Sequence, residues 1–236
     1  MDNGFMDLTN DILFTDEILS DEELTAHKYG TMPPRPIHLN IEPLGYTDKI
    51  YAGCVKVRKY MLLAECANGI FRFPFYEHIP ENATKPARAV LYLAQSGEDI
   101  TARMTADGYT VFRICSGDVC SPDGSFSDTN ERILCPSRKF KNTPGKIAIW
   151  AWALMRVIDY LSIRSDLDGD NLTVIGQGYL NESAALAFAR DKRIKYVMKD
   201  SDITGLYENC MTDAESTAHI GAKQRYLYAP GFFKNG

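Results

Sequence analysis

Apolar residues in the middle of the chain form short runs that turn signals separate. The first two runs cover residues 51–64 and 70–78, and Asn68-Gly69 lies between them. Asn-Gly between two such runs is a strong signal for a β-hairpin, because both residues accept the backbone angles of a tight turn. A third run, residues 87–94, follows a proline-bounded segment. We therefore expect an antiparallel pair of strands and then a further strand.

From the third run onward, the pattern alternates between strands and helices. Helices are expected near residues 100–107 and over residues 145–163, and strands over residues 109–115, 172–176 and 193–198. Such alternation is typical of crossover units that build a parallel sheet. The expected fold class is α/β: a three-layer sandwich with a mostly parallel sheet and antiparallel strands on its N-terminal side.

The helix expected over residues 145–163 has the clearest periodicity in the chain. Its apolar positions recur at helical spacing on one face: Ile147, Trp150, Ala151, Leu154, Ile158 and Leu161. Trp152 lies two positions from Trp150, so one of the two indoles is expected in the core and the other at a flank. The preceding residues 117–144 are rich in Ser, Asp, Gly, Asn and Pro. They are expected to pass over the sheet edge without contributing an element to the core.

The N-terminal residues 1–35 are acidic and polar. Ser20 is a candidate N-cap, followed by carboxylates that complement a helix dipole, and a short peripheral helix is expected to end near Gly30. The prolines after it break any helix and lead into extended chain. The remaining residues, 36–236, are of a length that suits a single domain.

Composition and charge exclude several classes of function. A formal net charge of -5 gives no reason to expect a nucleic-acid partner, since phosphates require concentrated Lys and Arg. The longest strongly apolar stretch, residues 147–155, is too short to cross a bilayer. The first residues lack the basic and apolar regions of a secretory signal, so the expected location is cytoplasmic.

No metal or cofactor site is predicted. The six cysteines contain no CxxC pair, so neither a zinc site nor a redox motif is indicated. Asp166, Asp168 and Asp170 alternate like the start of a calcium loop. Asn171 and Gln177, however, replace the glycine and the bidentate glutamate that such a loop requires. A polar turn explains these aspartates.

The most informative segment is the turn after the strand at residues 172–176. Gly176-Gln177-Gly178 joins an apolar strand to an Ala-rich helix, as in the G-x-S-x-G nucleophile elbow, where a serine occupies the apex. Gly178 stands at the apex position and has no side chain to attack a carbonyl. The turn therefore has the pattern of an elbow but not its nucleophile.

Four stretches of the chain resemble α/β-hydrolase-fold carbohydrate esterases of the acetyl xylan esterase and glucuronoyl esterase type. They are residues 71–76, 107–119, 145–161 and 174–190, of which the Gly-Lys-Ile-Ala-Ile-Trp-Ala-Trp helix start is the most specific. The resemblance covers roughly residues 50–205 and implies an ester hydrolase ancestry.

At the elbow, that family reads Gly-His-Ser-Arg-x-Gly-Lys. The resemblance implies a serine nucleophile, an arginine that helps to stabilise the oxyanion, and a lysine used toward substrate. This chain differs at each of these places: Gln177 for His, Gly178 for Ser, Tyr179 for Arg, Asn181 for the second Gly and Glu182 for Lys. The resemblance therefore implies loss of both the nucleophile and its supporting charges.

The resemblance also implies two further strands, which carry the acidic triad member and the histidine. Because the sequence ends at Gly236, we expect these strands to be missing. The strand from Arg193 to Met198 would then be a sheet edge with unpaired backbone groups. It is expected to be covered by the chain's own residues 203–236 or by the same strand of a second copy, which would make a homodimer, or by a partner chain.

Four other residues are weak candidates for catalysis. Ser183 is expected to be solvated or bonded to a backbone carbonyl of its helix. Ser201 follows a strand end, but the flanking Asp200 and Asp202 oppose an alkoxide. Cys115 ends a strand close to the expected site, without an identifiable activating group. His219 lies in an Ala/Gly-rich segment, where a structural role is commoner than a catalytic one.

Three interpretations remain open. The first is a non-catalytic relative of carbohydrate esterases, a pseudoenzyme that keeps a binding or assembly role, with a carbohydrate as the candidate ligand. The second is an active serine or cysteine ester hydrolase with a displaced nucleophile, or one completed by a partner chain. The third is a fragment without a selected function.

Overall fold

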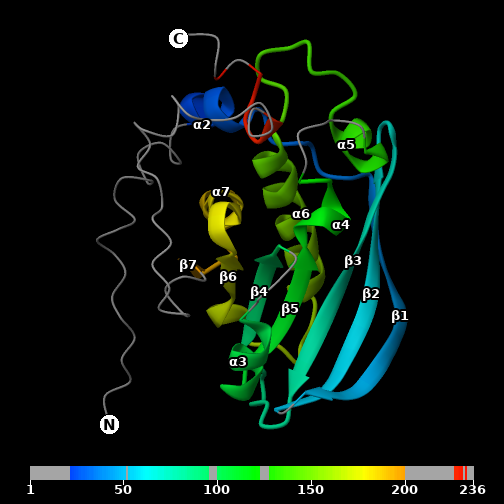
Figure 1. The fold of residues 1–236 in the computed structure, drawn as a ribbon, viewed down its shortest axis with the longest axis vertical. Coiled ribbons are helices and arrows are strands. Elements are labelled where there is room, and N and C mark those ends of the chain that lie inside the picture. Colours follow the sequence, from blue (N-terminus) through cyan, green and yellow to red (C-terminus); the bar gives the residue numbers. More distant parts are fainter. Residues whose placement is uncertain are drawn as a thin grey trace.

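A mixed seven-stranded sheet organises the protein in the computed structural model, in the order β1-β2-β3-β5-β4-β6-β7 (Figure 1). The structure describes residues 22–51, 53–95, 100–122, 128–199, 226–230 and 232. The sheet has an antiparallel half, β1 to β3, and a parallel half, β5, β4, β6 and β7. This arrangement confirms the predicted α/β class with antiparallel N-terminal strands.

The antiparallel half is a three-stranded meander. Its strands are β1 (His38–Tyr51), β2 (Cys54–Cys66) and β3 (Gly69–Pro80), and the predicted Asn-Gly turn joins β2 to β3. Strand β1 was expected only as extended chain. Its register is irregular between Pro43 and Gly45, and this interrupts the alternation that would have revealed it.

The parallel half contains the predicted alternation. Its strands are β4 (Ala89–Ala94), β5 (Thr110–Cys115), β6 (Thr173–Gly176) and β7 (Tyr196–Lys199). The helices between them include α3 (Thr101–Ala106), α6 (Lys146–Leu161) and α7 (Asn181–Arg190). The carboxyl ends of the four strands therefore share one edge of the sheet, and their amino ends share the other.

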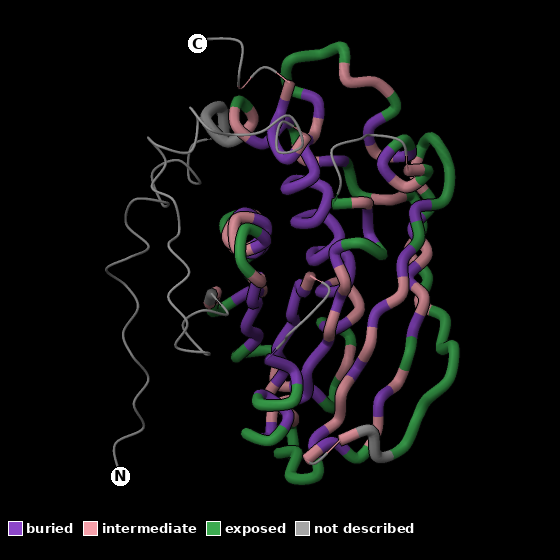
Figure 2. Tube along the Cα trace, in the orientation of Figure 1, coloured by how far each residue is buried: buried purple, intermediate pink, exposed green. Residues whose placement is uncertain are grey.

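Helices cover both faces of the parallel half. Alternate residues of β4 pack on opposite faces: Leu91 and Leu93 belong to the large core with α6 and α7, and Val90 and Tyr92 to a smaller core with α3. This alternation follows from the period of two in a strand. Buried residues dominate β4, β6 and α6 (Figure 2).

The expectation that one tryptophan of α6 lies at a flank is wrong. Trp150 and Trp152 are both fully buried. Trp150 Nε1 donates to the Ser116 carbonyl at 3.0 Å, and Trp152 Nε1 donates to the Pro34 carbonyl at 2.9 Å. Helix α6 is enclosed on more than one side, so residues two apart can both be core.

The expectation for residues 117–144 is also wrong in part. This region overlaps α4 (Ser116–Val119) and contains α5 (Thr129–Leu134), with Asp128 as a side-chain N-cap of α5. Val119, Cys120, Ile133 and Cys135 are buried. These few buried residues pack the short helices against the core. Because the region is mostly polar, its composition did not indicate them.

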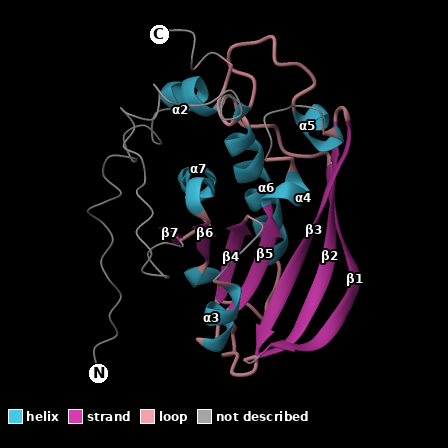
Figure 3. Cartoon of the chain, viewed as in Figure 1, coloured by secondary structure: helices cyan, strands magenta, loops and turns pink. Residues whose placement is uncertain are grey.

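The described terminal segments lie together beyond the carboxyl ends of the parallel strands (Figure 3). Helix α2 (Glu22–Tyr29) confirms the predicted short helix. The Tyr29 carbonyl accepts from Gly145 N–H at 2.8 Å, the Lys28 carbonyl from Ala229 N–H at 2.9 Å, and the Leu227 carbonyl from Ile147 N–H at 3.2 Å. Tyr29 is 2% exposed, so this helix is fastened to the body of the fold. None of the described helices is long and apolar enough to cross a membrane.

Candidate functional site

The turn between β6 and α7 has the tight geometry of an elbow. Strand β6 ends at Gly176, and a 3-10 turn η3 (Gly178–Leu180) leads directly into α7. A Cβ on Gly176 would lie 2.4 Å from the Leu180 carbonyl oxygen, so only glycine permits this close return of the chain. Gly178 has φ of +54°, the left-handed conformation that favours glycine.

The apex of the turn is exposed. Gly178 is exposed, and a Cβ built there would meet only the Gln95 side chain, with Nε2 at 3.4 Å. Space for a side chain therefore exists at the place where an elbow presents its nucleophile.

Gln177 ties the turn to the end of β4. Its Oε1 accepts the Gln95 N–H at 2.6 Å, and its own N–H donates to the Leu93 carbonyl at 3.0 Å. Gln95 Nε2 donates weakly to the Gln177 carbonyl at 3.5 Å. The side-chain amide of Gln177 therefore links the β6–α7 turn to the end of β4.

Tyr179 lies beside the apex with its ring against Trp150, at a centroid separation of 6.0 Å. Its side chain is 39% exposed. Burial, with a smaller contribution from Cys120, raises the pKa of its hydroxyl. The phenol is therefore neutral at physiological pH.

A buried ion pair supports the N-terminus of α6 near this turn. Lys146 Nζ and Glu131 Oε1 are 2.8 Å apart, and both side chains are fully buried. Lys146 Nζ also donates to the Ser121 carbonyl. Burial raises the pKa of Glu131, and the contact with Lys146 opposes that rise. Burial likewise raises the pKa of Cys120 well above its ordinary value, so this thiol stays protonated.

Glu182, where the resemblance has a lysine, anchors both terminal segments. Its carboxylate accepts hydrogen bonds from the Tyr29 and Tyr228 hydroxyls, each at 2.8 Å. Lys28 Nζ lies 3.3 Å from the same carboxylate. The two tyrosine rings stack at 6.1 Å. The charge reversal at position 182 thus has a structural role that the sequence did not reveal.

The structure places two of the four weak candidates. Ser183 is fully buried, and its Oγ has no hydrogen-bond partner among the described residues, so the expectation of a solvated or backbone-bonded serine is wrong. Cys115 is half-buried at the end of β5, opposite Ala94 of β4. Ser201 and His219 lie outside the described residues.

The structure describes three of the four histidines. His27 in α2 lies edge-on to Phe232, and His38 begins β1. His78 in β3 shares a 3.0 Å hydrogen bond with Tyr51. None belongs to β6, to α7 or to the strands that flank β6. Within the part of the chain that the structure describes, no group of three His, Cys, Asp or Glu could hold a metal ion.

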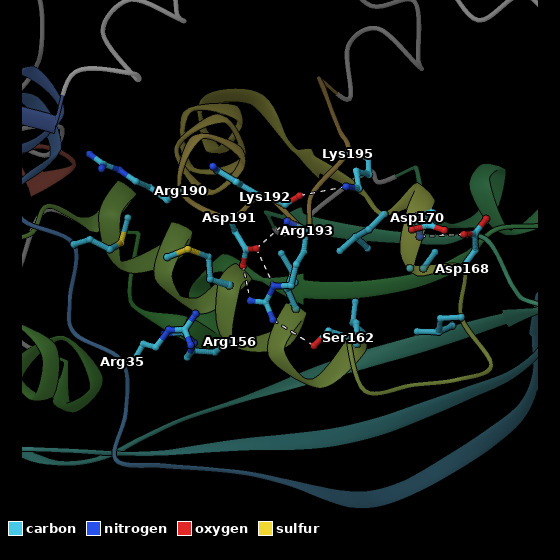
Figure 4. Close-up of a pocket in the computed structure, with 18 of the residues that line it drawn as sticks. Arg35, Arg156, Ser162, Asp168, Asp170, Arg190, Asp191, Lys192, Arg193 and Lys195 are labelled. Atoms are coloured by element: carbon cyan, nitrogen blue, oxygen red, sulfur yellow. Dashed lines mark hydrogen bonds and ion pairs between the residues drawn. The ribbon is translucent and has the colours of Figure 1, made fainter.

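A cavity of about 740 Å³ lies at the opposite end of the parallel strands (Figure 4). Its lining includes Ala89 at the start of β4 and Leu172 just before β6. The C-terminal half of α6, the turn η2 (Gly169–Asn171), the loop between α7 and β7, and residues 32–35 before β1 also line it. The turn that carries the resemblance and this cavity are thus separate features.

The cavity contains a compact charge network. Arg193 bridges two carboxylates, with Nη2 at 2.6 Å from Asp159 Oδ1 and 2.6 Å from Asp191 Oδ2. Arg156 Nε lies 2.8 Å from Asp159 Oδ2. Burial would raise the pKa of Asp191, but the hydrogen bonds from Arg193 outweigh it and lower that pKa.

Comparisons with solved structures identify the fold. A glucuronoyl esterase from Solibacter usitatus matches with a TM-score of 0.71 and 18% identity, over 94% of this chain and 66% of that one. A glucuronoyl esterase from Teredinibacter turnerae matches with a TM-score of 0.66 and 15% identity, over 96% and 59%. The catalytic domain of a glucuronoyl esterase from Hypocrea jecorina gives 0.63 and 18%, over 95% and 60%.

The chain therefore has the α/β-hydrolase fold, in the form found in carbohydrate esterases. It spans 59–66% of the length of these three structures. No protein-family model matches the chain, and no curated protein matches it in sequence.

Proposed function

We propose that this protein is a non-catalytic relative of carbohydrate esterases, which keeps the backbone of the elbow without its nucleophile. The observation that carries the proposal is the exposed Gly178, at φ of +54°, on the apex of the β6–α7 turn. Acyl transfer by such an elbow needs a side-chain oxygen or sulfur at this point.

The neighbouring positions support the proposal, because their polar groups are engaged in holding the fold. Gln177 bonds to Gln95, and Glu182 bonds to the hydroxyls of Tyr29 and Tyr228. Gln177 and Glu182 are therefore engaged in contacts within the protein. They do not supply the positive charges that the resemblance implies for stabilising an oxyanion and binding substrate.

The proposed remaining role is carbohydrate binding at the carboxyl end of the sheet. Tyr179 presents an exposed ring beside the apex, and aromatic rings of this kind stack on sugars. Thermal-shift measurements with acetylated xylan oligosaccharides and glucuronoyl esters should show stabilisation of the wild type. Tyr179→Ala should abolish the shift, whereas Tyr196→Ala, a matched exposed tyrosine on β7, should not. No shift with any of these sugars would count against the binding role.

Ester turnover tests the loss of catalysis itself. Wild type and Gly178→Ser should both fail to hydrolyse nitrophenyl acetate and glucuronoyl esters above the buffer rate. An inactive Gly178→Ser variant indicates that more than the nucleophile is missing. If the variant gains activity, the remaining groups of a catalytic site are in place and only the nucleophile was lost.

A second candidate function is an ester hydrolase that uses Cys115. This thiol is half-buried at the carboxyl end of β5, two strands from the β6–α7 turn, and therefore at the edge where α/β sheets place ligands. Turnover by wild type that Cys115→Ala abolishes and Cys66→Ala does not would establish this alternative. Ser183 is a weaker candidate because it is fully buried.

A further inference from the structure

The cavity at the amino ends of the parallel strands has the dimensions of a small-molecule site. Its volume of about 740 Å³ lies within the usual range for ligand pockets. Met155, Ile158 and Leu161 of α6 give it an apolar floor. A ligand with an apolar body could bury surface there.

Cations outnumber carboxylates around this floor. Three carboxylates line the cavity: Asp168, Asp170 and Asp191. Six cations line it: Arg35, Arg156, Arg190, Lys192, Arg193 and Lys195. The chain as a whole carries a net charge of -5, so this excess of positive charge is local.

Two of the three lining carboxylates are already engaged inside the protein. Asp191 binds Arg193, and Asp159, behind the lining, is shared between Arg193 and Arg156. Asp168 caps its own turn, accepting from Asp170 N–H at 3.1 Å and from Asn171 Nδ2 at 2.7 Å. Asp168 and Asp191 are therefore not available to neutralise the remaining cations of the lining, and the single charge of Asp170 is too small to balance them.

Three of the cations have no carboxylate partner in the described part of the chain. They are Arg35, which is exposed before β1, and Lys192 and Lys195, which are exposed after α7. Lys195 Nζ donates to the Lys192 carbonyl at 3.5 Å. Arg35 approaches another guanidinium: burial lowers the pKa of Arg156, Asp159 opposes this, and Arg35 lowers it further. Figure 4 shows Arg35 beside Arg156, with Lys192 and Arg190 across the cavity. Positive charges on both sides of one cavity, with Arg35 close to Arg156 on one of them, favour an anionic ligand.

We propose that this cavity binds a small organic anion, with its carboxylate or phosphate group attracted by the unpaired cations of the lining, Arg35 and Lys192 among them, and its apolar body on the floor of α6. The site is independent of the β6–α7 turn, and so of the function proposed above. Arginine and lysine bind such oxyanions through charge-assisted hydrogen bonds.

Fluorescence titration of the full chain with 8-anilinonaphthalene-1-sulfonate tests the proposal. This probe combines an apolar ring system with one anionic group, and we expect one saturable site per chain. Its neutral analogue N-phenyl-1-naphthylamine should bind at least about tenfold more weakly. The double variant Arg35→Gln/Lys192→Gln should lower the affinity for the sulfonate about tenfold, which corresponds to about 1.4 kcal/mol of binding free energy.

Arg72→Gln/Lys139→Gln is the matched control, because both side chains are exposed, lie outside the lining and give the same change in charge. It should leave the affinity unchanged. Displacement by phenyl phosphate or by benzoate then distinguishes a phosphate from a carboxylate ligand, and displacement by either one supports the site. Equal affinity in the two double variants, equal binding of the neutral analogue, or failure of both competitors would overturn the proposal.

Discussion

The two ends of the parallel half-sheet differ in how they use polar groups. At the carboxyl end, the β6–α7 turn has a bare glycine at its apex, and its amide and carboxylate neighbours bond within the protein. At the amino end, a cavity carries more cations than its carboxylates neutralise. Ligands of α/β sheets usually bind outside the carboxyl ends of the strands. The comparison shows that the polar side chains beside the elbow-like turn are paired within the protein, whereas the opposite end of the strands has an excess of positive charge.

Breaking the buried ion pair of Lys146 and Glu131 should give the largest loss of stability. Lys146→Met leaves Glu131 buried without its partner, which should lower the free energy of unfolding by about 3–5 kcal/mol. Urea denaturation monitored by the fluorescence of the two tryptophans measures this loss. The double variant Lys146→Met/Glu131→Leu should recover most of it, and a double variant as unstable as the single one would contradict the account.

The two glycines of the turn should respond differently. Gly176→Ala forces a Cβ against the Leu180 carbonyl and should cost about 3 kcal/mol. Gly178→Ala meets only the end of the Gln95 side chain, so it should cost only the left-handed strain of about 1 kcal/mol. Denaturant unfolding of both variants compares them, and equal losses would show that the shape of the turn does not depend on Gly176.

Removal of the Glu182 carboxylate should loosen both terminal segments. Glu182→Ala deletes the acceptor of two tyrosine hydroxyls and of Lys28, and should lower stability by about 2 kcal/mol. Hydrogen exchange should also increase at Lys28 and Ala229. In the Tyr29→Phe/Tyr228→Phe background, the same substitution should have a much smaller effect, and full additivity would refute the anchoring role.

Removing the Asp191 carboxylate from the charge network of the cavity should have a smaller effect on stability, and this effect should depend on pH. The pKa of Asp191 is lowered in the folded state, so its stabilisation is present above its ordinary value near 3.8 and is lost as pH falls through the folded value. The stability advantage of wild type over Asp191→Asn should therefore be constant above about pH 5 and shrink as the pH falls below the ordinary value of 3.8. Thermal unfolding across this range measures it. An advantage that is constant with pH would contradict the assignment.

Local patterns predicted much of the fold. Three predicted features are present: the Asn-Gly hairpin, the alternation after Ala89 and the helix that contains Trp150. They could be predicted because each depends on a pattern of neighbouring residues. The enclosure of both tryptophans was not predictable, because it depends on the Pro34 carbonyl and on other segments distant in sequence. The short helices within 117–144 were hidden for the same reason.

The candidate site was predictable only in part. The sequence indicated the glycine apex, since G-x-G after an apolar strand is a local pattern. It did not indicate the contacts of Glu182, whose partners Tyr29 and Tyr228 lie 153 and 46 positions away. The cavity was also missed, because its lining comes from five separate parts of the chain. The expected pairing of the strand at 193–198 with another segment or copy stays a prediction.

Covalent labelling tests the central claim most directly. Purified wild-type protein is treated separately with a fluorophosphonate and with iodoacetamide, and intact mass spectrometry follows the adducts, with Gly178→Cys as the control for access to the apex. The account predicts no fluorophosphonate adduct, slow alkylation of wild type, and rapid single alkylation of the exposed cysteine in the variant. A stoichiometric wild-type adduct that peptide mapping assigns to Ser183 or Cys115 would contradict it.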